Sequence, residues 1–145
     1  MSCKQVDDAA LASLARFPAL RELMPMDVED DGFRYIGQCA QLKHLWCMYC
    51  RDTTDIATQH IAGLSALKTY YAGKTQITDD SLAVLSSLTS LERLTFWETA
   101  ALTNAGISLR ARLPQLRELT LEGLPQVTAE VVSAFPPHVA VSYVP

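Results

Sequence analysis

The sequence predicts an α/β fold in which about five strand–helix units follow one another and share one parallel sheet. A leucine-led phrase recurs at steps of 22, 25, 24 and 25 residues, and its leading residues are Leu20, Leu42, Leu67, Leu91 and Leu116. Each phrase alternates apolar and polar residues as a strand does, and the stretch after it spaces its apolar residues as a helix does. Such a period is the signature of stacked repeats, whose units bury a continuous core only against their neighbours.

The first element is an N-terminal half-unit. Val6, Leu11, Leu14 and Phe17 follow the helical spacing of the later units without a leucine-led phrase ahead of them. A stacked sheet exposes unpaired strand edges, so we expect residues 6–19 to form a capping helix over one end. A chain that begins in the middle of a unit equally fits a piece of a longer protein.

The strands come next. We expect five parallel strands to begin near the five leading leucines and a short sixth strand at Val139, Val141 and Tyr143. Pro25 occupies the third apolar position of the first strand, and a proline lacks the N–H that a central strand donates. The first strand is therefore expected to be an edge strand.

Each strand is followed by a helical half, whose cleanest copy runs from Ile77 to Leu88. A Thr or Asp begins each half, as Thr78 and Asp79 do in this copy. An oxygen at this position can accept hydrogen bonds from the unpaired N–H groups of the first helical turn. The recurring acids are therefore expected to cap helices.

Length and composition predict one domain over residues 1–145, with the half-unit at 6–19, repeats at 20–138 and a C-terminal edge strand at 139–145. Hydrophobic residues make up 49% of the 145, enough to form a core. The formal net charge is -4 and no run of Lys or Arg occurs, so a nucleic-acid partner is not expected. No apolar stretch of about 18 residues and no secretory signal are visible, so we expect no membrane segment and a cytoplasmic location.

The repeating residues resemble the leucine-rich repeat family, above all its F-box-type, cysteine-containing repeats and similar bacterial repeats. The likeness spans about residues 6–144 and rests on the leucine-led phrases and on second halves of the form I-T-D-x-G-L. It implies a solenoid with a parallel sheet on its concave face, helices on its convex face and a partner protein bound by the concave face. Cys50 takes the family's Asn/Cys position, Thr75, Thr99 and Leu124 take it in later units, and no F-box accompanies these repeats.

Cys47 and Cys50 form a C-x-x-C pair, which can exchange thiols or supply half of a zinc site. The repeat frame gives both a structural place, Cys47 in the core of its strand and Cys50 at the turn after it. His44 cannot serve Cys47 as a base, because residues three apart on a strand face opposite sides of the sheet. We expect no catalytic residue and no cofactor, with a zinc or thiol-redox site at the two cysteines as an alternative.

Acidic residues recur at 29–31, at Asp55 and at 79–80, and they should stack along one side of the molecule, where a cation could bind. Helix capping and the helix dipole already account for acids at these positions. We therefore expect no metal site among them.

The residues between the leucines should point out of the sheet in three columns. The columns are Glu22, His44, Thr69, Arg93 and Glu118; Met24, Trp46, Tyr71, Thr95 and Thr120; and Met26, Met48, Gly73, Trp97 and Glu122. Neighbouring strands lie about 4.8 Å apart, so the Met, Trp and Tyr side chains should form one exposed patch. Such patches often mark interaction sites. The alternative is that the rings only stack on one another, or that a missing part of a longer protein covers them.

We therefore expect a non-catalytic protein–protein interaction module that binds an unidentified protein on its concave face. The predicted contact residues are Met24, Met26, His44, Trp46, Met48, Tyr71, Arg93, Trp97, Glu118 and Glu122. Glutamates flank the aromatic residues, so a partner with an apolar anchor and a basic edge would fit. One alternative is the repeat segment of a ubiquitin-ligase-type or other multidomain adaptor. As to assembly, we expect a monomer or weak self-association through strand edges.

Overall fold

The structure, a computed structural model, describes residues 2–3 and 8–145. Its strands are β1 (Ser2–Cys3), β2 (Glu22–Pro25), β3 (His44–Cys47), β4 (Thr69–Gly73), β5 (Arg93–Trp97), β6 (Glu118–Glu122) and β7 (Ala140–Val144). Its α-helices are α1 (Asp8–Leu11), α2 (Asp30–Ile36), α3 (Asp55–His60), α4 (Asp79–Leu85) and α5 (Asn104–Ser108). Three 3₁₀ helices complete it: η1 (Ala12–Arg16), η2 (Leu109–Arg112) and η3 (Ala129–Ala134).

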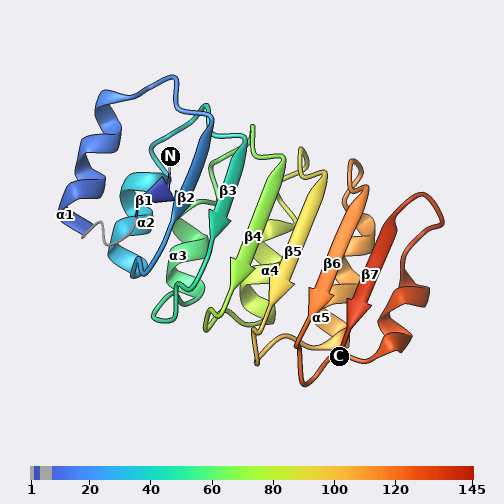
Figure 1. The fold of residues 1–145 in the computed structure, drawn as a ribbon. Helices are drawn as coiled ribbons and strands as arrows, with labels where there is room; N and C mark the ends of the chain where they lie inside the picture. Colours follow the sequence, from blue (N-terminus) through green and yellow to red (C-terminus); the bar gives the residue numbers. More distant parts are fainter. Residues whose placement is uncertain (1, 4–7) are drawn as a thin grey trace.

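The strands form one parallel sheet in sequence order, from β1 at one end to β7 at the other. Helices α2 to α5 all lie on the same side of this sheet, and we call the other side the open face (Figure 1). The predicted α/β class with a parallel sheet is thereby confirmed. Each leucine-led strand begins two residues after its leading leucine. The pairing of β3 with β2 starts at this point, where the N–H groups of Lys43 and His44 both donate to the carbonyl of Arg21.

The prediction that the first leucine-led strand is an edge was wrong. β1 pairs in parallel with β2, with Ser2 opposite Met24 and Cys3 opposite Pro25. Alternate residues of a strand direct their backbone polar groups toward opposite neighbours, and the Met48 N–H donates to the Pro25 carbonyl at 3.4 Å. The N–H that Pro25 lacks would therefore have pointed toward β3. Its absence does not prevent β1 from pairing with β2.

The predicted capping helix at 6–19 is only partly regular. Residues 6 and 7 lie outside the described residues, and the rest forms the short α1 followed by the 3₁₀ helix η1. Phe17 was expected on the apolar side of this helix, but it is 56% exposed. Its counterparts in the next two units, Cys39 and Leu64, are buried.

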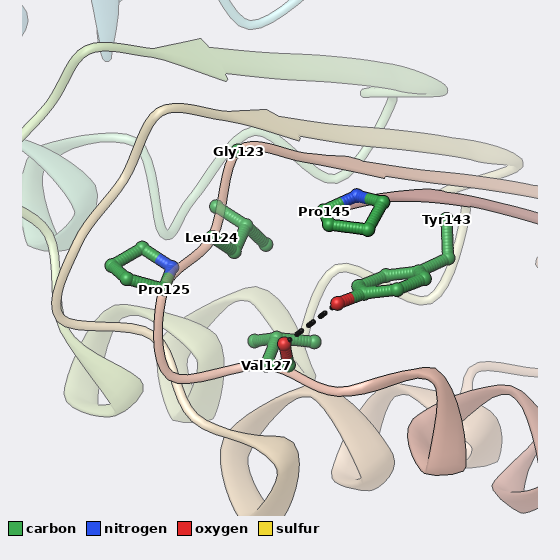
Figure 2. Close-up of a pocket in the computed structure, with 6 residues that line it drawn as sticks. All are labelled: Gly123, Leu124, Pro125, Val127, Tyr143 and Pro145. Carbon is green, nitrogen blue, oxygen red and sulfur yellow. Dashed lines mark hydrogen bonds between the residues drawn. The ribbon is translucent and has the colours of Figure 1, made fainter.

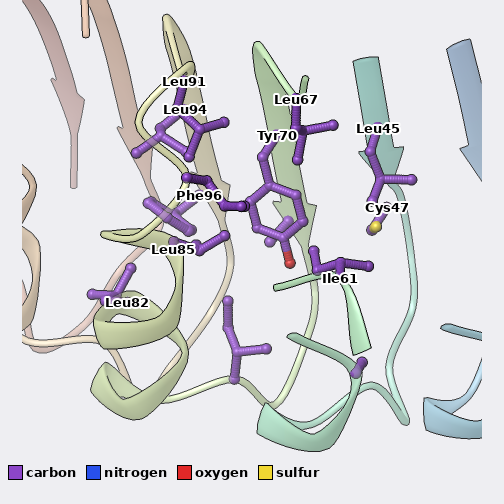
Figure 3. Packing of buried hydrophobic residues seen from close by; sticks show 14 of the residues in the cluster. Leu45, Cys47, Ile61, Leu67, Tyr70, Leu82, Leu85, Leu91, Leu94 and Phe96 are labelled. Carbon is purple, nitrogen blue, oxygen red and sulfur yellow. The ribbon is translucent and has the colours of Figure 1, made fainter. Parts of the chain in front are cut away.

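The core lies between the sheet and the helices. The leucines at the core positions of the strands are buried, and Tyr70 of β4 lies among Ile61, Leu67 and Phe96 (Figure 3). Arg110 is a charged residue in this layer, with 1% of its surface exposed, and it donates to the carbonyl of Leu82. Burial lowers its pKa to about 10, against the opposing effect of Asp79, so it remains charged at neutral pH.

Hydrogen bonds between neighbouring units explain the recurring Thr and Asp residues. The hydroxyls of Thr54, Thr78 and Thr103 cap α3, α4 and α5, as predicted. Asp30, Asp55 and Asp79 instead each accept the backbone N–H and the hydroxyl of the N-cap threonine in the following unit, at 2.6 to 3.0 Å. The expectation that the acids cap helices was therefore wrong for these three, because their carboxylates bind the next unit.

Among residues 2–3 and 8–145, no helix has the length and apolar character needed to cross a membrane.

Candidate interaction surface

The strand register confirms the three predicted columns. His44, Thr69, Arg93 and Glu118 lie side by side, as do Trp46, Tyr71, Thr95 and Thr120. In the third column Met26 pairs with Met48, and Gly73, Trp97 and Glu122 follow one another across β4 to β6. The period of two along each strand therefore places the Met, Trp and Tyr side chains on the open face, away from the helices.

These apolar side chains are half-buried rather than freely exposed. We call them the aromatic patch: Met24, Met26, Trp46, Met48, Tyr71 and Trp97. The ring of His44 stacks on Trp46 with 5.6 Å between centroids and 15° between planes. The His44 Nδ1 also lies 3.0 Å from the hydroxyl oxygen of Thr69. Contacts within the open face thus cover part of the surface that the sequence predicted to be exposed.

Gly73 shapes the centre of the patch. A Cβ atom built on Gly73 would lie 2.7 Å from Cε1 of Tyr71 and 3.0 Å from Cε3 of Trp97. Real Cβ atoms essentially never approach a neighbour closer than 3.0 Å, so the two rings occupy the space of the missing side chain. Gly73 is itself buried beneath them. Both rings therefore approach the same empty position in the third column at β4.

A row of left-handed residues borders the third column, and the sequence reasoning missed it. Asp27, Tyr49, Lys74, Glu98 and Gly123 have φ values of 54°, 57°, 54°, 45° and 63°. Each lies seven residues after a leading leucine, so the repeat frame was the signal that could have found them. This conformation costs a residue other than glycine about 1–2 kcal/mol. Four of the five are not glycine and accept that cost, and the side chains of Tyr49, Lys74 and Glu98 lie beside the aromatic patch.

The side chain of Lys74 lies between two aromatic rings and a carboxylate. Its Nζ is 4.8 Å from the ring centroid of Trp97 and 5.4 Å from that of Tyr49, and it forms an ion pair with Glu98 at 3.1 Å. The rings of Tyr49 and Trp97 meet edge to face, with centroids 5.4 Å apart at 86°. Rings that face a cation in this way attract it through their quadrupole.

Tyr71 and Glu122 complete this group. Burial is the largest cause that raises the pKa of the Tyr71 phenol, followed by Glu122, Tyr49 and Glu98. The two carboxylates are therefore close enough to the phenol to disfavour its ionised form. We call the whole group the Lys74 cluster: Tyr49, Tyr71, Lys74, Trp97, Glu98 and Glu122.

The predicted contacts Arg93 and Glu118 belong to the opposite end of the strands. Arg93 Nε donates to Glu118 Oε2 at 2.9 Å, and both side chains are 54% exposed. They occupy the first column, four residues before Trp97 and Glu122 on β5 and β6. Arg93 and Glu118 are therefore not part of the Lys74 cluster, which lies at the other end of these strands.

Three of the four cysteines lie in the core. Cys39, Cys47 and Cys50 are free thiols, and the side chains of Cys47 and Cys50 are fully buried. Burial raises the pKa of Cys47 well above its ordinary value, while a hydrogen bond with Cys47 lowers the pKa of Cys50. His44 lies on the open face and Cys47 on the core face, so the two cannot act as a pair. Within the described part of the chain, no three His, Cys, Asp or Glu side chains converge to hold a metal ion.

Two hollows lie away from the predicted contacts. One of about 440 Å³ lies at the C-terminal end between Leu124, Val127 and Tyr143, where the Tyr143 hydroxyl donates to the Val127 carbonyl at 3.0 Å (Figure 2). The other, of about 400 Å³, lies beside Lys68 and Glu92, which form an ion pair at 2.8 Å. The predicted contacts line neither of these two hollows.

Comparison of the sequence with models of known protein families gives no match, and comparison with curated proteins gives none either. The geometry of the open face therefore carries the functional argument.

Proposed function

We propose that the chain is a leucine-rich-repeat solenoid and a non-catalytic protein–protein interaction module, which binds a partner protein through the open face as the concave side of its sheet. The parallel strands in sequence order, the leucines in the core and the steps of 22 to 25 residues support the solenoid. Three buried free thiols suit a reducing compartment such as the cytoplasm. We propose a monomer, with weak self-association through the strand edges at the ends of the sheet as the alternative.

The observation that carries this proposal is the aromatic patch on the open face. Soluble proteins rarely gather large apolar side chains on an uncovered surface without a partner, and Trp and Tyr are the commonest anchors of protein interfaces. Here Trp46, Tyr71 and Trp97 come from three consecutive strands and lie on one face. A partner that covers this face would bury all three rings together.

Energetics indicate that the patch alone supports only weak binding. Complete burial of one such side chain is worth about 1.5–3 kcal/mol, and each of these rings has already lost part of its exposure in the free protein. A micromolar complex requires about 8 kcal/mol net of the entropy lost on association. Polar and charged groups around the patch must therefore contribute to a stable complex.

Affinity capture with matched variants tests the proposal. We expect proteins captured by the wild type to be lost from a Trp46→Ala/Trp97→Ala variant, because both anchors are removed. A Thr120→Ala/Ser142→Ala variant is the control, since it alters the open face outside the patch. Circular dichroism and thermal unfolding must show that each variant is folded. Retention of every captured protein by the tryptophan variant, or equal loss in the control, would overturn the proposal.

A further inference from the structure

The Lys74 cluster holds one more carboxylate than it holds cations. Lys74 forms its ion pair with Glu98, at 3.1 Å. Glu122 lies beside Trp97 in the register and forms no ion pair among the residues that the structure describes. One negative charge therefore remains uncompensated next to aromatic rings.

The same cluster already shows that its rings accept a cation. The Lys74 ammonium lies within 5.4 Å of the ring centroids of both Tyr49 and Trp97. Aromatic rings combined with carboxylates form the usual environment for a bound cationic group in proteins. Tyr71 adds a third ring, which contacts the same Gly73 position as Trp97.

The charge of the surrounding surface also favours a cation. The three columns and the left-handed row together carry five acidic and two basic side chains: Glu22, Asp27, Glu98, Glu118 and Glu122, with Lys74 and Arg93. Both basic side chains are already paired within the protein. The third column and the left-handed row carry three of these acids against Lys74 alone, so a basic partner segment would meet an attractive potential at this end of the strands.

We infer that the Lys74 cluster binds an arginine side chain of a basic partner segment, with its guanidinium between the carboxylate of Glu122 and the rings of Tyr71 and Trp97. A guanidinium is planar, stacks on an aromatic face and donates two parallel hydrogen bonds to one carboxylate, whereas an ammonium acts as a point charge. The inference rests on the proposed function for the origin of the segment. The arginine site itself can be tested without the partner.

The test uses N-acetyl-arginine amide as the probe and N-acetyl-citrulline amide as its neutral isostere. The chain has two tryptophans, so Trp46→Phe leaves Trp97 as the single indole, whose N–H signal is followed by NMR during titration. We expect saturable shifts at Trp97 and Tyr71, with a Kd in the millimolar range for arginine and binding at least about fivefold weaker for citrulline. Equal binding of the two probes would overturn the inference.

Four charge variants locate the site. Glu122→Gln should weaken arginine binding at least about threefold, and Lys74→Gln should strengthen it by a similar factor, because it frees Glu98 as a second carboxylate. Glu118→Gln and Arg93→Gln make the same changes in charge in the first column and should have little effect. If Glu118→Gln weakened binding as much as Glu122→Gln, the attraction would be a general effect of net charge and the inference would fail.

The outcomes separate this inference from the proposed function. If arginine does not bind but the Trp46→Ala/Trp97→Ala variant loses its partners, only the arginine site is wrong. If arginine binds at the cluster but partner capture is unchanged in that variant, the arginine site stands and the interaction module is wrong.

Discussion

Tyr70 and Tyr71 are adjacent residues of β4, yet they lie on opposite faces of the sheet in opposite environments. Tyr70 is 1% exposed and packs among apolar side chains, whereas Tyr71 lies over Gly73 near two glutamates. Phe96 and Trp97 repeat the contrast on β5, where Phe96 is fully buried and Trp97 contacts Lys74. The same strands thus build a dry core on one side and a charged aromatic surface on the other.

This contrast separates the side chains that stabilise the fold from those of the proposed interaction surface. The core face is covered by helices, so its side chains contribute mainly through burial and close packing. The open face keeps its rings half-buried through contacts with one another and with charged groups, and these remain available to a partner. Substitutions on the core face should therefore lower the free energy of unfolding more than substitutions on the open face do.

The largest difference is expected between Phe96→Ala and Trp97→Ala. Removal of a fully buried ring leaves a cavity, so Phe96→Ala should lower the free energy of unfolding by about 3–5 kcal/mol. Trp97→Ala removes a larger ring from the surface without enclosing a cavity, and its cost should stay below about 2 kcal/mol. Urea denaturation followed by circular dichroism measures both. Equal losses would mean that the open face is part of the core.

The next difference concerns two glycines. Gly73→Ala should lower stability by about 1–3 kcal/mol and shift the fluorescence of Trp97, because the new methyl group meets the rings of Tyr71 and Trp97. Gly63→Ala is the matched control, since nothing lies within 4 Å of its Cβ position, and it should be neutral or slightly stabilising. A neutral Gly73→Ala would show that the rings do not depend on the missing side chain.

A smaller effect is expected at Asp55, on the helix side. Burial alone would raise the pKa of Asp55, but hydrogen bonds from Ser81 and Thr78 outweigh it and lower the pKa below its ordinary value of 3.8. A lowered folded pKa stabilises the fold above the unfolded pKa, and this contribution is lost as the pH falls through the folded value. Asp55→Asn should therefore destabilise more at pH 7 than at about pH 3. Urea denaturation at the two pH values measures this, and an equal cost at both would contradict the assignment.

The smallest effect is expected from removing the Tyr70 hydroxyl. This oxygen is buried near Thr58 without a hydrogen bond of good geometry, and burial is the main cause that raises its pKa. Tyr70→Phe should change stability by less than about 1 kcal/mol, in either direction. Thermal unfolding is a sufficient test, and a loss of several kcal/mol would indicate a buried hydrogen bond that the geometry does not show.

The sequence correctly predicted which residues of the neighbouring strands lie beside Trp46 and Trp97 on the open face. It succeeded because strand periodicity and repeat length together fix which residues lie side by side. It overestimated how exposed the rings are. Tyr71 and Trp97 approach Gly73, and this depends on side-chain rotamers, which the spacing of residues along the sequence does not determine. It also missed β1, whose two residues form no pattern, and the role of Asp55, whose hydrogen-bond partners belong to the next unit.

The position of Lys74 could not be predicted for a different reason. Its side chain reaches the rings from a left-handed backbone, a conformation that sequence rules assign to glycine or asparagine. Tyr49 and Glu98 share this conformation. Propensity rules therefore pointed away from the residues that build the cluster.

The left-handed row is a place where glycine substitutions would change the backbone and the open face together. Glycine at Tyr49, Lys74 or Glu98 would relieve an unfavourable backbone by up to about 1 kcal/mol per position, and Gly123 already shows that relaxed form in the same molecule. The same glycines would remove the ammonium, the carboxylate and the phenol that surround Trp97. A variant with these glycines is therefore expected to lose the proposed binding surface while it keeps its fold.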